Sequence, residues 1–182
     1  MYTAIGSVKS RAFRVLWMLE ELEQPYTYQP QPPQSDAVQA LNGSGKIPVL
    51  LDGAHVISDS VAIVQYLADK HHCLTYVAGT PERAQQDSWT QMILDELDAV
   101  LWAAARHSFV LPEDKRVPEV KSSLRWEFAQ SMARLVTRMG PGPFLMGAQI
   151  TVPDIILTHC ARWAKGAKFD GIPQQILSLI HI

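Results

Sequence analysis

The stretch KIPVLLDGAHVISDSVAIVQYL, residues 46–67, combines a hairpin signal with a helix start. Two apolar runs, 49–51 and 55–57, flank an Asp-Gly pair, and glycine accepts the positive φ angle that a tight turn requires. The spacing therefore predicts two antiparallel strands. Residues 58–60, with the sequence Ser-Asp-Ser, then supply capping side chains for a helix whose apolar positions continue to Ala68.

The residues before this stretch predict a strand, a helix and a second strand. Residues 1–5 carry β-forming side chains and precede a glycine, and apolar side chains recur with helical spacing over 11–23. A Gln-Pro pair stops that helix, residues 26–28 have the composition of a strand, and the three prolines of 30–35 indicate a loop. The two strands joined by a helix are expected to be parallel, which makes the first half an α/β domain.

The pattern becomes helical in the second half. Residues 73–80 are expected to be a linker, and helices are expected over 81–107 and 118–139. Thr151 and Asp154 have the spacing of a capping box at the start of another helix. We therefore expect an α/β domain over residues 1–72, the linker, and an all-helical domain over 81–182.

Composition and charge narrow the function. The 182 residues carry a formal net charge of −2, with scattered Lys and Arg, which argues against binding to nucleic acid or to an anionic membrane surface. Charged residues interrupt the first apolar region, so neither a secretory signal nor a membrane span is expected there. Cys73 and Cys160 lack the spacing of metal ligands, so we expect no disulfide framework and no metal site. The simplest expectation is a cytoplasmic protein with a small-molecule or protein partner.

Two places in the opening stretch carry chemistry. A cis peptide bond before Pro48 would turn the backbone of Ile47 outward to pair with a peptide-like ligand; a plain proline at a strand edge is the alternative. At the following helix start, free N–H groups and the helix dipole attract a carboxylate. Ser60 could add a hydroxyl donor there and Asp59 could face an ammonium group, which suits an amino-acid end; simple helix capping is the alternative.

Three segments together resemble the cytosolic glutathione transferases. Besides the opening stretch, YTAIGSVKSRAFRVLWMLEELEQPY (residues 2–26) resembles the family's first strand and helix, and FLMGAQITVPDIIL (144–157) resembles its buried capping box. The three occur in the family's order and span most of the chain. The resemblance implies a thioredoxin-like glutathione-binding domain followed by a helical domain that forms the electrophile pocket, and it gives Asp154 a structural role.

The resemblance also implies roles in glutathione binding. Ile47, beside a cis Pro48, would pair its backbone with the cysteinyl part, while Asp59 and Ser60 would hold the γ-glutamyl end. Lys46 would approach the glycyl carboxylate, with a solvated surface lysine as an equal alternative.

The thiol of glutathione needs a hydrogen-bond donor near the turn between the first strand and the first helix. A free thiol has a pKa of about 8.5 and must become a thiolate to attack. Ser10, at the helix start, is the leading candidate for this donor, and Ser7, at the strand end, is its rival; helix capping is the alternative for each. Lys9 stands where some members have serine and Val8 where proline is frequent, so the choice stays open.

The expected function is that of a serine-type, bacterial-like glutathione S-transferase in detoxification, which conjugates the glutathione thiolate to small hydrophobic electrophiles. Glutathione would be a co-substrate, no metal is expected, and the family implies a homodimer. The alternatives are a non-catalytic binding module with this fold and a glutathione-dependent oxidoreductase or peroxidase. The absence of cysteine between residues 5 and 14 argues against the redox alternative.

The chain is shorter at its C-terminus than the family it resembles. Residues 174–182 are expected to form little more than two helical turns, and the apolar positions of 176–180 would prefer a partner surface. Lower stability than that of a longer version is the expected consequence.

Overall fold

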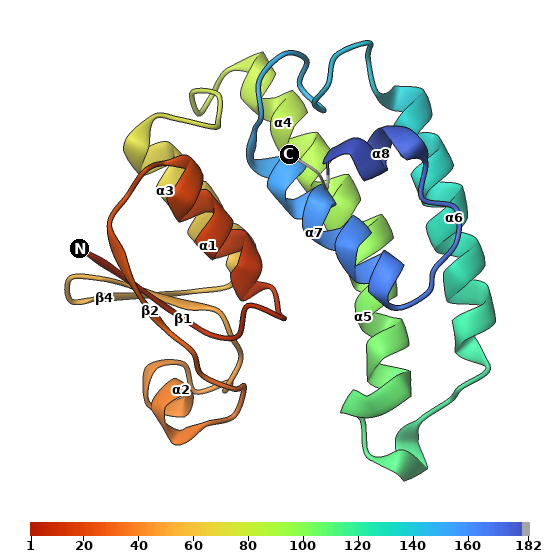
Figure 1. Ribbon diagram of the computed structural model, residues 1–182, viewed down its shortest axis with the longest axis horizontal. Coiled ribbons are helices and arrows are strands. Elements are labelled where there is room, and N and C mark those ends of the chain that lie inside the picture. Colours follow the sequence, from red (N-terminus) through yellow and green to blue (C-terminus); the bar gives the residue numbers. More distant parts are fainter. Residues whose placement is uncertain (180–182) are drawn as a thin grey trace. The chain divides into compact units, whose positions relative to one another are not determined.

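The computed structural model describes residues 1–179 and divides into two compact units, Met1–Arg83 and Ala84–Ile182. The division falls in the first turn of the helix that follows Thr80. Figure 1 shows the helices and strands of each unit. The predicted division of the chain into an α/β domain (1–72), a linker (73–80) and a helical domain (81–182) stays a prediction.

The first unit is a four-stranded mixed sheet with three helices, and the sequence predicted the four strands and two of the helices of this thioredoxin-like domain. The sheet order is β2-β1-β3-β4; β1 runs parallel to β2 and antiparallel to β3, and β3 and β4 form the hairpin. The helix α2 was not predicted; its cap is the Ser35 side chain, which accepts a hydrogen bond from the Val38 N–H at 3.4 Å. The elements are β1 (Tyr2–Ile5), α1 (Ala12–Glu21), β2 (Tyr26–Gln29), α2 (Asp36–Leu41), β3 (Val49–Asp52), β4 (His55–Ser58) and α3 (Ser60–His71).

Helices cover both faces of this sheet (Figure 1). The pair α1 and α3 lies on one face, and α2 lies on the other. The apolar stripe predicted for α1 is buried, with Val15 and Leu19 fully inaccessible. On the opposite face, Val38 of α2 packs with Ile5 and Val49 of the sheet.

The second unit is helical among its described residues. One continuous helical run extends from α4 to residue 110, close to the prediction of 81–107; one π-helical turn interrupts it and a second one ends it. Thr80 caps it as predicted, because its Oγ1 accepts a hydrogen bond from the Arg83 N–H at 3.2 Å. The elements are α4 (Pro81–Ile93), a π turn (Leu94–Asp98), α5 (Ala99–Ala105), a π turn (Arg106–Val110), a 3-10 turn (Glu113–Lys115), α6 (Val120–Arg138), α7 (Val152–Gly166) and α8 (Gln174–Leu179).

The helix α7 is the centre of the second unit, and the predicted capping box starts it. Asp154 is 1% exposed; its Oδ2 accepts hydrogen bonds from the Thr151 N–H at 2.9 Å and the Thr151 hydroxyl at 2.8 Å. Its Oδ1 accepts from the Leu145 N–H at 2.8 Å, which ties the preceding loop to the helix. Burial raises the pKa of Asp154, against the opposing effect of these bonds. Every residue from 152 to 161 is buried.

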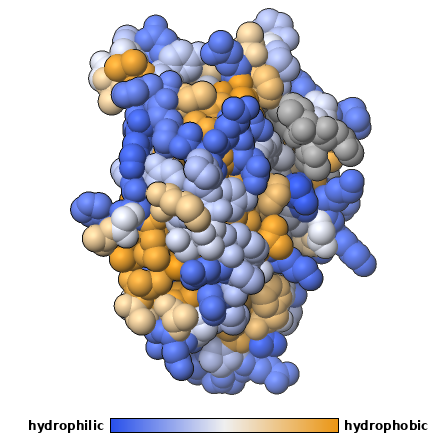
Figure 2. Space-filling model, turned by 60° about the vertical axis from the view of Figure 1, so that its left-hand side comes forward, coloured by the Kyte–Doolittle hydropathy of each residue, from blue (hydrophilic) through white to orange (hydrophobic). Residues whose placement is uncertain are grey.

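The described part of α8 packs within the second unit. Ile176 is fully buried there, so this apolar side chain needs no partner surface to cover it. Residue 180, the last of the apolar tail, lies outside the described residues. Within residues 1–179, no helix is both long enough and apolar enough to cross a membrane. On the face shown in Figure 2, apolar side chains gather in several patches with hydrophilic surface between them.

A polar network joins β3 to the end of α3. Asp52 accepts hydrogen bonds from the Tyr66 hydroxyl at 2.5 Å and from the Lys70 ammonium group. Lys70 also lies 5.2 Å from the ring centre of Tyr2 in β1. These contacts, chiefly the one with Lys70, hold the pKa of Asp52 below its ordinary value.

Asp52→Asn is expected to reduce stability only where Asp52 is ionised. A carboxyl whose folded-state pKa is lowered contributes stability above its unfolded-state pKa, about 3.9, and loses it as the pH falls through the folded-state value. The variant should therefore melt at a slightly lower temperature than the wild type at neutral pH, and the difference should vanish near pH ~2. Thermal unfolding at both pH values measures this. Asp114→Asn is the control, because both side chains of the Asp114–Lys115 pair are exposed. A difference in melting temperature between Asp52→Asn and the wild type that is the same at both pH values would contradict the stabilising role of ionised Asp52.

Candidate functional site

Two segments far apart in the sequence meet at the end of β1. Gly6 follows that strand with φ 147°, and a Cβ there would lie 2.9 Å from the Cβ of Ala12 and 3.3 Å from that of Ile47. Only glycine fits this close approach without a shift of its neighbours. The peptide bond between Ile47 and Pro48 is cis. Pro48 is buried and Ile47 half-buried, and both lie close to the turn after β1.

Tyr28 of β2 holds the turn after β1, a role that the sequence did not reveal. Its hydroxyl donates a hydrogen bond to the Gly6 carbonyl at 3.0 Å and accepts one from the Val8 N–H at 3.2 Å. The Gly6 N–H donates to the Gln29 carbonyl at 3.1 Å, which continues the parallel ladder. In the sequence, Tyr28 is simply a β-forming residue, and nothing marks its contact with a turn twenty residues away.

The two candidate serines differ in their hydrogen bonds. The Ser10 hydroxyl donates to the Ser7 carbonyl at 2.6 Å and accepts from the Ala12 N–H at 3.1 Å, so its proton serves the local backbone. The Ser7 hydroxyl accepts from the Lys9 N–H at 3.3 Å, and within residues 1–179 it makes no other hydrogen bond. The Ser7 proton is therefore available to an incoming group, while Ser10 acts at the helix start.

The start of α3 brings the predicted Asp59 and Ser60 next to the cis proline. Val49 pairs with Ser58 in the antiparallel hairpin, which places Pro48 beside Asp59 just beyond that pair. Asp59 is exposed, has φ 75°, and its Oδ1 accepts from the N–H groups of Val61 at 2.9 Å and of Ala62 at 3.2 Å. The Asp59 side chain therefore caps the helix.

Ser60 accepts a hydrogen bond from a buried arginine of α1. Arg14 is fully buried, and its Nη1 donates a hydrogen bond to the Ser60 Oγ at 3.2 Å. Because Arg14 occupies a lone pair of that oxygen, the Ser60 proton remains a donor at the helix start. Ser60 itself is only 2% exposed.

Lys46 lies on the surface at the other side of the cis bond. Its side chain is exposed, and the structure shows no ion pair for it among residues 1–179. Its backbone carbonyl accepts a hydrogen bond from the Asn42 side chain at 2.9 Å, which fixes the segment before the proline. The site thus combines a cis peptide bond, a helix start with a carboxylate, and a hydroxyl donor.

A family model described as the glutathione S-transferase N-terminal domain matches residues 5–75. The first unit, Met1–Arg83, is thus similar to that N-terminal domain over most of its length. The matched range contains the candidate glutathione-binding positions and both serines. No curated protein sequence matches the chain.

Solved structures show that the whole chain has the glutathione transferase fold. A glutathione transferase from Methylococcus capsulatus is 20% identical with a TM-score of 0.83, and the match covers 100% of this chain and 91% of that one. The URE2P6 transferase from Phanerochaete chrysosporium, solved with oxidized glutathione, is 22% identical with a TM-score of 0.82, covering 99% and 90%. A theta class enzyme from Xanthomonas axonopodis, solved with glutathione bound, is 25% identical with a TM-score of 0.72, covering 92% of each chain.

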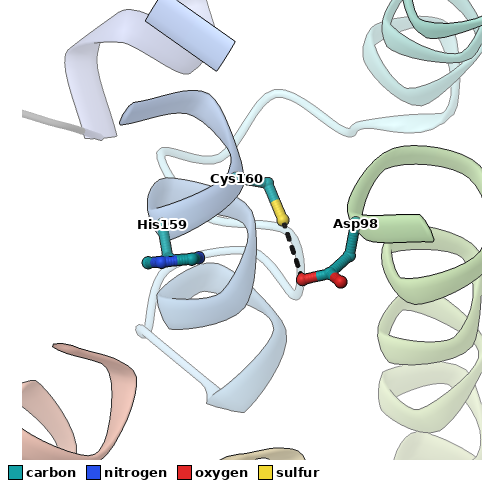
Figure 3. A group of neighbouring side chains, drawn as sticks. All are labelled: Asp98, His159 and Cys160. Carbon is teal, nitrogen blue, oxygen red and sulfur yellow. Dashed lines mark hydrogen bonds between the residues drawn. The ribbon is translucent and has the colours of Figure 1, made fainter. Parts of the chain in front are cut away.

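The helical unit of this glutathione transferase fold contains one group of possible metal ligands among the described residues. Asp98, His159 and Cys160 are buried, and one ligand atom of each lies within 4.8 Å of the others. The Cys160 thiol and the Asp98 carboxylate point toward each other at 3.8 Å, whereas the His159 ring extends from another side of α7 (Figure 3). Consecutive helical residues project about 100° apart, and ligands bound to zinc at about 2.0–2.3 Å must converge more closely. The cluster in this arrangement therefore does not form a coordination sphere, and the sequence-based expectation of no metal stays a prediction.

Proposed function

We propose that this protein is a glutathione S-transferase that conjugates the thiolate of glutathione to small hydrophobic electrophiles. The observation that carries the proposal is the meeting of three features in the first unit: the turn at Gly6 and Ser7, the cis Ile47–Pro48 bond, and the start of α3 at Asp59. A tripeptide with an amino-acid end has a complementary group for each feature.

The proposed roles follow the local geometry. The Ile47 backbone pairs with the cysteinyl residue of glutathione, beside the cis Pro48. The Asp59 carboxylate faces the γ-glutamyl ammonium group, and the Ser60 hydroxyl, at the positive end of the α3 dipole, binds its carboxylate. Lys46 approaches the glycyl carboxylate. Several weak contacts along one extended peptide thus orient its sulfur.

The chemistry is nucleophilic attack by a stabilised thiolate. A hydroxyl donor and the start of α1 favour the anion of glutathione, and orientation next to the electrophile supplies proximity. The new carbon–sulfur bond forms with the sulfur electron pair, and the leaving group or carbanion takes up the displaced charge. Because its proton has no other partner in the described chain, Ser7 is the donor that we favour over Ser10. A homodimer in the cytoplasm, with a role in detoxification, completes the proposal on the strength of the family resemblance.

Ser7→Ala is expected to raise the pKa of bound glutathione by about one unit or more, because a lost hydrogen bond to an anion corresponds to roughly that shift. The rate of conjugation to chlorodinitrobenzene at neutral pH should then fall roughly tenfold or more, with little change in glutathione affinity. The pH profile of kcat measures both the pKa of bound glutathione and the rate of conjugation. Ser10→Ala is the matched control and should act mainly on stability, through the lost helix contact.

The reverse outcome would exchange the roles of the two serines. If glutathione binds but neither the wild type nor any variant turns over an electrophile, the enzyme proposal fails and a non-catalytic binding module is the remaining function. Reduction of a mixed disulfide or a peroxide by the same sample would instead favour the oxidoreductase.

A further inference from the structure

A cavity of about 250 Å³ lies inside the second unit, between the ends of α5, α6 and α7. Its floor is apolar: Leu101, Ala104 and Ala105 line it and are buried in the helical core. Trp163 of α7 and Phe169, just beyond that helix, add aromatic walls. Every lining residue belongs to the second unit, whereas the proposed glutathione site is built from the first.

Two cations face this apolar cavity. Lys121 and Arg125 stand one turn apart on α6, and both line it. The Arg125 guanidinium lies 5.4 Å from the ring centre of Phe169, which fixes the side chain over the aromatic wall. No Asp or Glu is among the lining residues, and within residues 1–179 neither cation forms an ion pair. The cavity therefore has an uncompensated positive rim over an apolar floor.

We propose that this cavity binds a small aromatic carboxylate. The ring would lie on the alanine floor against Trp163, and the carboxylate would reach the ammonium group of Lys121 and the guanidinium group of Arg125. A guanidinium group and an ammonium group together complement one monoanion, and charge-assisted hydrogen bonds to carboxylate are among the strong ones.

The dimensions restrict the ligand. Pockets for drug-sized molecules typically measure about 300–1,000 Å³, so a cavity of 250 Å³ suits one or two fused rings rather than a long acyl chain. Ser108 also lines the cavity, but its hydroxyl donates to the Ala104 carbonyl at 2.7 Å. The orientation of the ligand would therefore be set by the two cations.

Calorimetric titration of the full chain with naphthoate and with its neutral isostere naphthamide tests the proposal. Naphthoate should bind to the wild type at least tenfold more tightly than naphthamide, and added salt should weaken only the carboxylate. In the double variant Lys121→Gln, Arg125→Gln, naphthoate should bind about tenfold more weakly and lose its advantage over the amide. Lys165→Gln removes an exposed lysine of α7 that does not line the cavity and should bind both ligands as the wild type does.

Two further measurements keep the test independent of folding. Ala104→Leu fills the cavity from its floor and should abolish naphthoate binding, while circular dichroism reports whether the helices are intact. Lys121→Gln alone leaves the Arg125–Phe169 contact in place and should still weaken naphthoate binding severalfold. Equal affinity for naphthoate and naphthamide in the wild type would overturn the proposal in favour of a neutral apolar occupant. Absence of naphthoate binding at millimolar concentration, or unchanged binding to folded Ala104→Leu, would also overturn it.

Discussion

Asp154→Ala is expected to lower the free energy of unfolding by about 3–5 kcal/mol, the largest effect that we expect on stability. Asp154 accepts hydrogen bonds from the Leu145 N–H, the Thr151 N–H and the Thr151 hydroxyl at 2.8–2.9 Å, and it is 1% exposed. Alanine would leave two buried backbone N–H groups without an acceptor, each at a cost of about 1–3 kcal/mol. Since α7 forms the centre of its unit, a loss of its first turn would affect the whole unit.

Urea unfolding of the full chain measures this loss of unfolding free energy. Two milder variants are expected to show smaller losses. Asp154→Asn keeps one acceptor oxygen, so it should lose less than the alanine variant. Thr151→Val removes the hydroxyl that donates to Asp154 and caps the helix, and it should cost about 1 kcal/mol. A loss below 1 kcal/mol for Asp154→Ala would show that water replaces the carboxylate and that the capping box is dispensable.

Asp59→Asn is expected to weaken glutathione binding by about 10–100-fold while it leaves stability nearly unchanged, and we expect no larger effect on affinity. The Asp59 Oδ1 accepts hydrogen bonds from the Val61 and Ala62 N–H groups, and an asparagine oxygen can accept the same two bonds. The substitution therefore keeps the helix cap and removes the charge. A charge-assisted bond to the γ-glutamyl ammonium group contributes about 1.5–3 kcal/mol, which corresponds to the stated range.

A ligand without the amino group makes this test specific. Glutaryl-cysteinylglycine lacks only the ammonium group, so wild type and Asp59→Asn should bind it with the same affinity in calorimetry. Asp59→Ala serves as the second control, since it removes cap and charge together and should also lower stability by about 1 kcal/mol. Unchanged glutathione affinity in Asp59→Asn would mean that Asp59 acts only as the cap of α3.

Much of the fold was predictable because its signals are local. The Asp-Gly hairpin, the Thr80 cap and the Thr151–Asp154 capping box each involve side chains and backbone groups no more than about four residues apart. The parallel pairing of the first two strands also followed from the helix between them. The short α2 was missed because a six-residue helix after a proline-rich loop has too few apolar positions to show a period.

The candidate site, like the fold, could be predicted from the sequence only in part. The sequence by itself determined which residue types stand at the strand start and the helix start, including Ile47, Pro48 and Asp59, and the family resemblance gave them roles. Only the tertiary structure decided how the turn after β1 is held and that the Arg14 side chain is buried. Tyr28 holds the turn through contacts that cross 20 and 22 residues, and Arg14 donates to the Ser60 hydroxyl across 46 residues. A linear pattern reports the neighbours of a residue along the chain, whereas burial and the availability of a proton depend on neighbours that folding alone brings together.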